Sequence, residues 1–168
     1  MTVAPERHEP APTGSEFDQL SGFLDYLRAT VEWKCAGLTD EQARRSLVPS
    51  ELTTVAGLLG HLAWVENFWF EVKIAGGADP LAGELAVDGD ADFRDGMRRP
   101  LDELLAIYRT RCARSREVVI GLALDHTVAW RDQQVTVRWI LIHMIEETAR
   151  HAGHLDLLRE LTDGLTGE

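Results

Sequence analysis

Four long segments of this chain repeat apolar residues every three or four positions, which is the period of an amphipathic α-helix. The spacing predicts helices over residues 16–35, 53–77, 100–119 and 136–163. Gly164 suits the end of the last helix, because glycine adopts the left-handed conformation that often follows a helix. No segment has a convincing strand period, so we predict an all-α protein built as a four-helix bundle.

The connections between these helices differ in composition. Thr39 and Gln42 have the spacing of a capping box, which predicts a short extra helical turn. Residues 76–99 are rich in Gly, Asp and Ala, so we expect a loop with one short helical turn around Phe93. Apolar and polar residues alternate weakly over 124–136, which indicates an extended excursion over the bundle.

Size and composition indicate one domain. The chain has 168 residues, 45% of them hydrophobic and 27% charged, as in ordinary globular proteins. Residues 1–15 hold three prolines among polar neighbours, so we expect a flexible N-terminal arm followed by a single domain over residues 16–168. Cys35 and Cys112 are far apart and match no disulfide framework or metal motif, so we expect small core residues.

Charge and hydropathy exclude several classes of partner. The net charge of −11 argues against a nucleic-acid surface, which needs clustered Lys and Arg. No stretch approaches the ~20 uninterrupted apolar residues of a membrane-spanning helix, and the first residues lack the apolar core of a signal peptide. We therefore expect a cytoplasmic protein.

The last helix carries a carboxylate on the side that should face the core. At about 100° per residue, His151 falls about 40° from Glu147 and His154 about 20° from it, close to the apolar Ile140. His61 lies on the apolar stripe of the second helix. Two helices can therefore bring His61, Glu147 and His151 to one point inside the bundle.

Such a group has the chemistry of a metal site. A lone carboxylate in a core loses several kcal/mol of hydration or becomes protonated, and a divalent cation removes this cost. Two imidazoles and one carboxylate suit Zn²⁺ or another borderline metal, and three ligands leave a coordination position open, as in catalytic sites. A structural alternative remains: His61 could be a hydrogen-bonded core residue, and Glu147 could pair with an arginine.

Other residues near this group have less defined roles. His143, about 40° from Glu147, and His154 could hydrogen-bond a metal ligand or a substrate, and His143 could equally bond a backbone carbonyl. Trp130 could overhang a substrate mouth, whereas the other four tryptophans suit the core. The chain contains neither the H-E-x-x-H motif of zinc proteases nor the Glu-x-x-His pairs of di-iron bundles.

Three runs of this sequence carry a family resemblance: residues 49–53, 60–66 and 137–160. They resemble the actinobacterial branch of the DinB-like superfamily, and the likeness covers nearly the whole chain after residue 15. Proteins of this kind are four-helix bundles that hold a divalent metal, commonly zinc or nickel, through one ligand on the second helix and two on the fourth. The resemblance implies His61, Glu147 and His151 as the ligands.

Characterised members of this superfamily include mycothiol-dependent maleylpyruvate isomerase and the mycothiol and bacillithiol S-transferases. In the isomerase the ligands are His, Glu and His. Many relatives have His where Glu147 stands, so the glutamate favours the mycothiol-using branch. The isomerase carries an additional C-terminal domain, whereas this chain ends soon after Gly164. We therefore expect a stand-alone S-transferase. His154 stands where the wider family often has Gln.

The resemblance implies a low-molecular-weight thiol, mycothiol, as cosubstrate and a small electrophile as the second substrate. We expect the metal to favour the thiolate, which attacks the electrophilic carbon. Two alternatives remain: a non-catalytic metal-binding stress or interaction protein, and a metal-dependent hydrolase. Many relatives dimerise, and the apolar band on the last helix, which reaches Leu141, Ile145 and Ala152, leaves area for a homodimer.

Overall fold

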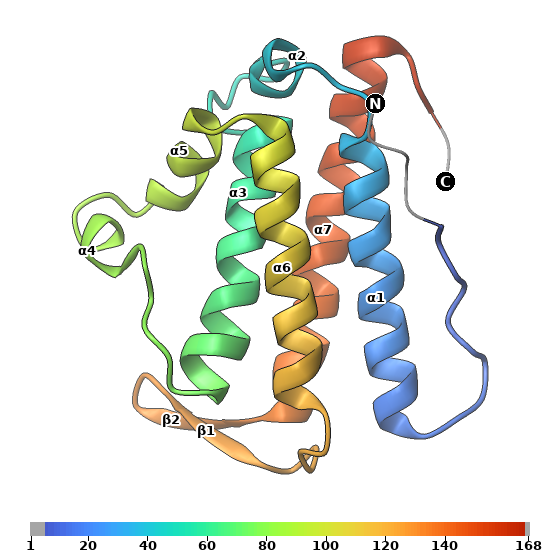
Figure 1. Ribbon diagram of the computed structural model, residues 1–168, viewed down its shortest axis with the longest axis vertical. Coiled ribbons are helices and arrows are strands. Elements are labelled where there is room, and N and C mark those ends of the chain that lie inside the picture. The colour runs from blue at the N-terminus through green and yellow to red at the C-terminus, as the bar shows by residue number, and fades with distance from the viewer. Residues whose placement is uncertain (1–5, 167–168) are drawn as a thin grey trace.

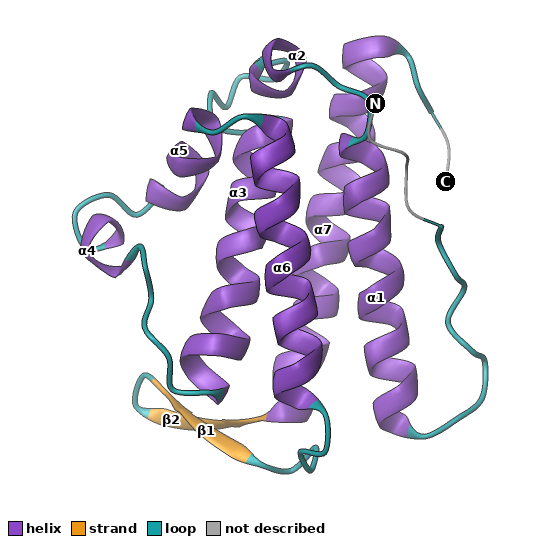
Figure 2. Ribbon diagram, in the orientation of Figure 1, coloured by secondary structure: helices purple, strands orange, loops and turns teal. Residues whose placement is uncertain are grey.

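The four predicted helices assemble into one bundle in the computed structural model, which describes residues 6–166 (Figure 1, Figure 2). They are α1 (Glu16–Cys35), α3 (Val55–Glu66), α6 (Leu101–Val119) and α7 (Val137–Asp163), with the short α2 (Asp40–Arg44) after α1. The helix α3 continues into η1 (Asn67–Ile74), a segment of π-helix. The all-α four-helix bundle is therefore confirmed.

The order of the helices in space explains the long connection before α6. The helix α1 packs along α7, and α3 packs along both α6 and α7. In Figure 1, α1 and α7 run in one direction, and α3 and α6 run in the opposite direction. Because α3 and α6 are parallel neighbours, the chain must return along the outside of the bundle between them, and α4 (Ala82–Leu85) and α5 (Ala91–Arg98) lie on this path.

Local hydrogen bonds set the ends of the helices. The hydroxyls of Thr54 and Thr136 accept backbone N–H groups in the first turns of α3 and α7, and the predicted capping box of Thr39 and Gln42 opens α2. Gly164 ends α7 in the left-handed conformation, with φ 76°. These caps agree with the predicted boundaries to within a few residues.

The connection over residues 76–99 holds more helix than the sequence analysis predicted. The predicted helical turn around Phe93 is part of α5, which is longer than expected, and α4 is an additional helix that was not predicted. The helix α5 packs on α3 partly through Gly96. A Cβ at this position would lie 2.3 Å from the backbone oxygen of Ala56, so only glycine allows so close an approach. Since the contact is made by backbone, the apolar periodicity that normally reveals a packed helix is weak.

The predicted excursion over residues 124–136 is an antiparallel hairpin of β1 (Thr127–Trp130) and β2 (Gln133–Thr136). It covers one end of the bundle (Figure 2). Its tight turn places Arg131 at φ 56°, a conformation that glycine or asparagine usually supplies. The usual sequence signal for a hairpin is therefore missing, which explains why only an extended segment was predicted.

Apolar side chains form two clusters, one toward each end of the bundle. A layer of buried polar residues, Arg28, Glu66 and Ser115, separates them and is called the polar layer below. The guanidinium of Arg28 donates two hydrogen bonds of 2.7 Å to the two oxygens of Glu66, and Ser115 Oγ donates to Glu66 Oε2 at 2.6 Å. Every oxygen of this buried carboxylate is thus paired.

Both cysteines are buried free thiols, as predicted. Burial raises the pKa of Cys35 to about 12, so this thiol is not a nucleophile at neutral pH. None of the helices in the described part of the chain is long and apolar enough to cross a membrane. The prediction that Leu141 and Ala152 contribute to a free apolar surface for a homodimer was wrong, because both residues are buried within the chain itself.

The predicted arm lies partly outside the described residues, which begin at residue 6. Residues 6–14 contain no helix or strand. The guanidinium of Arg7 lies over the rings of Trp33 and Tyr26, at 4.4 and 5.6 Å from their centroids. This part of the arm therefore runs along α1.

Candidate metal centre

The structure brings together His61 on α3 with Glu147 and His151 on α7, and these three side chains are called the donor group below. One nitrogen or oxygen of each lies within 4.8 Å of the other two. Glu147 Oε1 is 2.9 Å from His61 Nε2 and 3.2 Å from His151 Nε2. The side chains are 11–16% exposed, so the group lies at the edge of the bundle, within reach of solvent.

The buried carboxylate of Asp92 on α5 contacts His61 on the side of the ring that faces away from Glu147. Asp92 is 3% exposed, and its Oδ2 lies 2.6 Å from His61 Nδ1. When Nδ1 donates its proton to Asp92, Nε2 keeps a lone pair that faces Glu147. The ring of Phe93 stacks on the imidazole at a centroid distance of 4.4 Å. Both contacts fix the plane of the ring, as carboxylate–histidine pairs do in metal sites.

Two glycines allow α5 to approach α3 closely enough for this contact. A Cβ on Gly60 would lie 2.6 Å from Gly96 Cα and 2.9 Å from the backbone oxygen of Asp92. Gly60 therefore serves close packing of the two helices. The glycine pair thus places Asp92 beside His61.

Hydrogen bonding sets the charge of the donor group. Burial disfavours the imidazolium of His61, but its hydrogen bonds to Asp92 and Glu147 outweigh burial and raise its pKa. Hydrogen bonds from His151 and His61 hold the pKa of Glu147 well below its usual range, so this carboxylate is ionised. In the protonated form both ring nitrogens of His61 donate, Nδ1 to Asp92 and Nε2 to Glu147, and a cation that binds Nε2 takes the place of the second proton.

The donor group suits a divalent metal. Ligands of one zinc ion at ~2.0–2.2 Å lie at most ~4.4 Å from each other, and the three donor atoms are already near this range. Two imidazoles and a carboxylate favour borderline metals such as zinc and nickel. Among the described residues no fourth acidic, His or Cys side chain joins the group, so a ligand from solution has room to bind.

The two other histidines predicted near the site occupy different places. His154 Nδ1 lies 3.3 Å from His151 Nδ1, so it contacts one donor from outside the group. Burial and the neighbouring His151 and Arg150 lower the pKa of His154. His143 has no contact with the donor group among those found in residues 6–166. It stacks on Trp139 at a centroid distance of 5.1 Å.

His143 belongs to an aromatic cluster with Trp69, Trp130 and Trp139 near the hairpin. Trp69 contacts each of the other three rings at 5.2–5.5 Å between centroids. Further ring contacts lead from His61 through Trp64 and Phe68 to Trp69. A wall of rings therefore extends from the donor group to the hairpin, where Trp130 lies.

The sequence analysis did not identify Asp92. Its only local signal was its position beside Phe93, where a helical turn was expected, in a segment with many other acidic residues. A carboxylate can be assigned to a histidine only when the path of the chain between them is known. The structure supplies that path through α5.

Comparison with known proteins gives the family. A family model of mycothiol S-transferases matches residues 19–164, which include the donor group and Asp92. Among curated proteins, no match to this chain was found. Since the family model covers most of the sequence, from α1 to the end of α7, the chain belongs to the mycothiol S-transferase family.

Proposed function

We propose that this protein is a divalent-metal-dependent S-transferase that joins mycothiol, a low-molecular-weight thiol, to a small electrophile. One observation carries the proposal: in a chain of the mycothiol S-transferase family, His61, Glu147 and His151 converge from two helices. Asp92 supports it, because a buried carboxylate that orients one imidazole is what a metal ligand requires.

The donor group favours zinc, and nickel also suits it. When bound, the cation would favour the thiolate of the cosubstrate over the thiol and so supply the nucleophile at neutral pH. Glu147 is the one anionic donor among the three, so a divalent site keeps net positive charge and attracts an anion. With an electrophile such as monochlorobimane, one sulfur–carbon bond would form as the carbon–chlorine bond breaks; chloride leaves with the bonding electron pair, and the thiol proton passes to solvent.

The surrounding side chains position the donors. Asp92 directs Nε2 of His61 toward Glu147, and the stacked ring of Phe93 prevents the imidazole from turning. Trp64 is a further ring neighbour of His61, at 6.3 Å between ring centroids. These rings limit water around the donors, which strengthens electrostatic interactions there.

The test compares two neighbouring glutamates on α7. Purified protein is loaded with zinc or nickel, its metal content is measured by elemental analysis, and conjugation of mycothiol to monochlorobimane is followed by fluorescence. Glu147→Gln should lose the metal and at least about 100-fold in activity. The matched control is Glu146→Gln, since Glu146 is exposed and contacts Arg150 and His143 instead of the donors; it should keep both properties.

The outcome separates the alternatives. Metal binding without conjugation above the no-enzyme rate, across several thiols and electrophiles, would support a non-catalytic metal-binding protein. Ester hydrolysis without thiol, lost in the Glu147→Gln variant, would support a hydrolase. Full activity in protein that holds no metal would contradict the proposal itself.

A further inference from the structure

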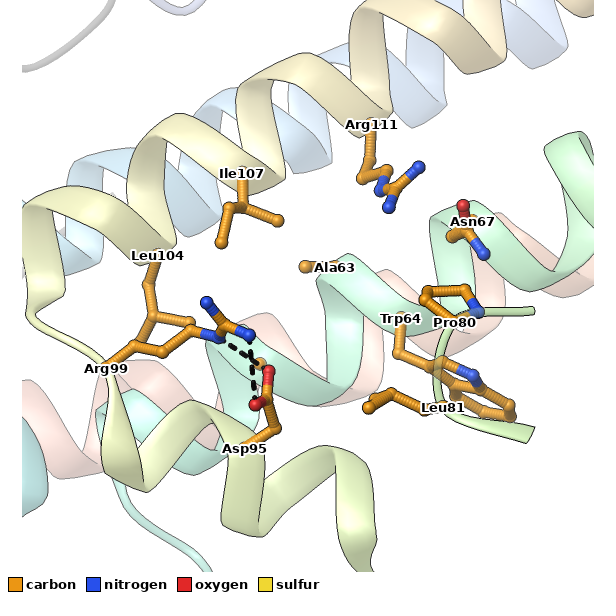
Figure 3. Close-up of a pocket in the computed structure, with 11 residues that line it drawn as sticks. Ala63, Trp64, Asn67, Pro80, Leu81, Asp95, Arg99, Leu104, Ile107 and Arg111 are labelled. Atoms are coloured by element: carbon orange, nitrogen blue, oxygen red, sulfur yellow. Dashed lines mark hydrogen bonds and ion pairs between the residues drawn. The ribbon is translucent and has the colours of Figure 1, made fainter. Parts of the chain in front are cut away.

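A cavity of about 190 Å³ lies between α3 and α6, beneath the segment that leads to α4 and α5 (Figure 3). Its apolar wall includes Ala63, Leu81, Leu104 and Ile107. None of the three residues of the donor group lines it. The three donor side chains therefore lie outside the cavity wall, although Trp64 belongs to this wall and also lies 6.3 Å from the His61 ring.

Asn67 is a buried polar residue in this wall. Asn67 is only 3% exposed, and neither its Nδ2 nor its Oδ1 has a hydrogen-bond partner among the described residues. An unpaired buried amide is costly, so such groups normally have a partner. Asn67 is also the first residue of η1, and π-helical turns are frequent at functional sites.

Arg111 is the second polar residue without a partner. The other three arginines of α6 form ion pairs: Arg109 with Glu32, Arg114 with Glu71, and Arg116 with Asp25. No ion pair or side-chain hydrogen bond of Arg111 is found within residues 6–166. Figure 3 shows its guanidinium directed toward the space beside Ala63 and Asn67.

The opposite end of the cavity has no free charge. There Arg99 donates hydrogen bonds of 2.7 and 3.1 Å to Asp95, and a further one to Glu103 (Figure 3). These two carboxylates compensate its charge. An anion in the cavity would therefore bind at the Arg111 end.

We propose that this cavity is a second ligand site, which binds a small carboxylate that also carries a secondary amide and an apolar group, such as an N-acylated apolar amino acid. The carboxylate pairs with Arg111. One carboxylate oxygen also accepts a hydrogen bond from Asn67 Nδ2, and the amide N–H, which can lie on the same side of the amino acid as this oxygen, donates to Oδ1. The apolar group packs on Leu104 and Ile107. A simple carboxylate would leave Oδ1 unpaired, which is why the amide is part of the assignment.

Three probes of similar size test this chemistry by calorimetric titration. N-acetyl-L-leucine carries all three features, N-acetyl-L-leucinamide lacks the charge, and 4-methylpentanoate lacks the amide. We expect N-acetyl-L-leucine to bind with a Kd on the order of 1 mM, as small ligands do, and the other two at least about 10-fold more weakly. Equal binding of all three, or no saturable binding of N-acetyl-L-leucine, would overturn the proposal.

Three variants locate the site. Arg111→Gln should weaken binding of N-acetyl-L-leucine at least about 10-fold. Its melting temperature should stay unchanged, because Arg111 has no partner in the described chain. Arg114→Gln on the same helix is the matched control and should change the Kd less than about twofold. Glu147→Gln should bind the probe normally; binding lost in this variant but kept in Arg111→Gln would place the carboxylate at the metal centre and refute the assignment.

Discussion

Replacing Asp92 with asparagine tests whether a carboxylate on α5 prepares His61 for a metal. The substitution keeps the size of the side chain and removes its charge. Asp92 is buried, and its Oδ2 lies 2.6 Å from Nδ1 of His61. An amide that turns its NH₂ toward this nitrogen forces the imidazole proton onto Nε2, which then cannot bind a cation. The variant should therefore bind zinc more weakly.

The size of the effect follows from the contact. Loss of a hydrogen-bond partner of a metal ligand typically lowers metal affinity 10- to 100-fold, or about 1.4–2.7 kcal/mol. The contact between Asp92 and His61 is short and lies out of solvent, where hydrogen bonds to charged groups are strongest. We therefore expect a loss near 100-fold.

Competition with a chromophoric zinc chelator measures this loss. Asp90→Asn is the matched control, because Asp90 lies exposed at the start of α5 and its side chain caps no backbone group. It should bind zinc like the wild type. Melting temperatures in excess chelator show whether both variants fold. A zinc affinity of Asp92→Asn within about threefold of the wild type would refute the argument that Asp92 orients His61.

Three further results are expected. Glu66→Leu should lower the free energy of unfolding in urea by about 3–5 kcal/mol because it removes the buried carboxylate that accepts two hydrogen bonds from Arg28 and leaves this buried guanidinium paired, among the described residues, with the part-exposed Asp25 alone, whereas the double variant with Arg28→Met should recover most of this loss. Gly60→Ala should lower both the melting temperature and zinc affinity because the new Cβ pushes α5 away from α3, while Gly153→Ala, which has open space, should be neutral or stabilising by up to about 1 kcal/mol. In metal-free protein, burial lowers the pKa of His61, but hydrogen bonds to two carboxylates outweigh burial and raise this pKa above the unfolded value of about 6.5. The protonation of His61 therefore stabilises the folded state fully below about pH 6.5, and this stabilisation is lost as the pH rises through the folded-state pKa. The melting temperature in chelator should accordingly fall as the pH rises above about 6.5, and it should fall less with zinc, whose binding releases protons. A flat profile in chelator would count against this shift.

The long helices could be predicted because the information is local. Apolar period and caps such as Thr54 and Thr136 act within one or two turns, so each helix is largely specified by its own residues. The full length of α5 and the pairing of the hairpin strands could not be predicted, because both depend on contacts with other parts of the chain. Packing of Gly96 on α3 stabilises the first, and Arg131 takes a turn conformation that its residue type seldom adopts.

The same distinction holds for the candidate site. Glu147 and His151 are one turn apart, so their shared face follows from helix geometry, and His61 needed only one assumption about neighbouring helices. Asp92 lies 31 positions from His61 in a segment whose path the sequence does not specify. The partner of Glu66, Arg28, is 38 positions away. Neither pair can be recognised from a regular spacing of residues in the sequence.

Three polar residues in one stretch of helix differ in where their hydrogen-bond partners lie. His61, Glu66 and Asn67 each interrupt the apolar pattern of α3 and the start of η1. His61 and Glu66 are satisfied by other parts of the chain, through α5, α7 and the polar layer. Asn67 is not satisfied among the described residues, although it is nearly as buried as Glu66 and more buried than His61. Since an unpaired buried amide is costly and residues 6–166 offer it no partner, we infer that its partner is water or the ligand that the cavity beside Arg111 would hold.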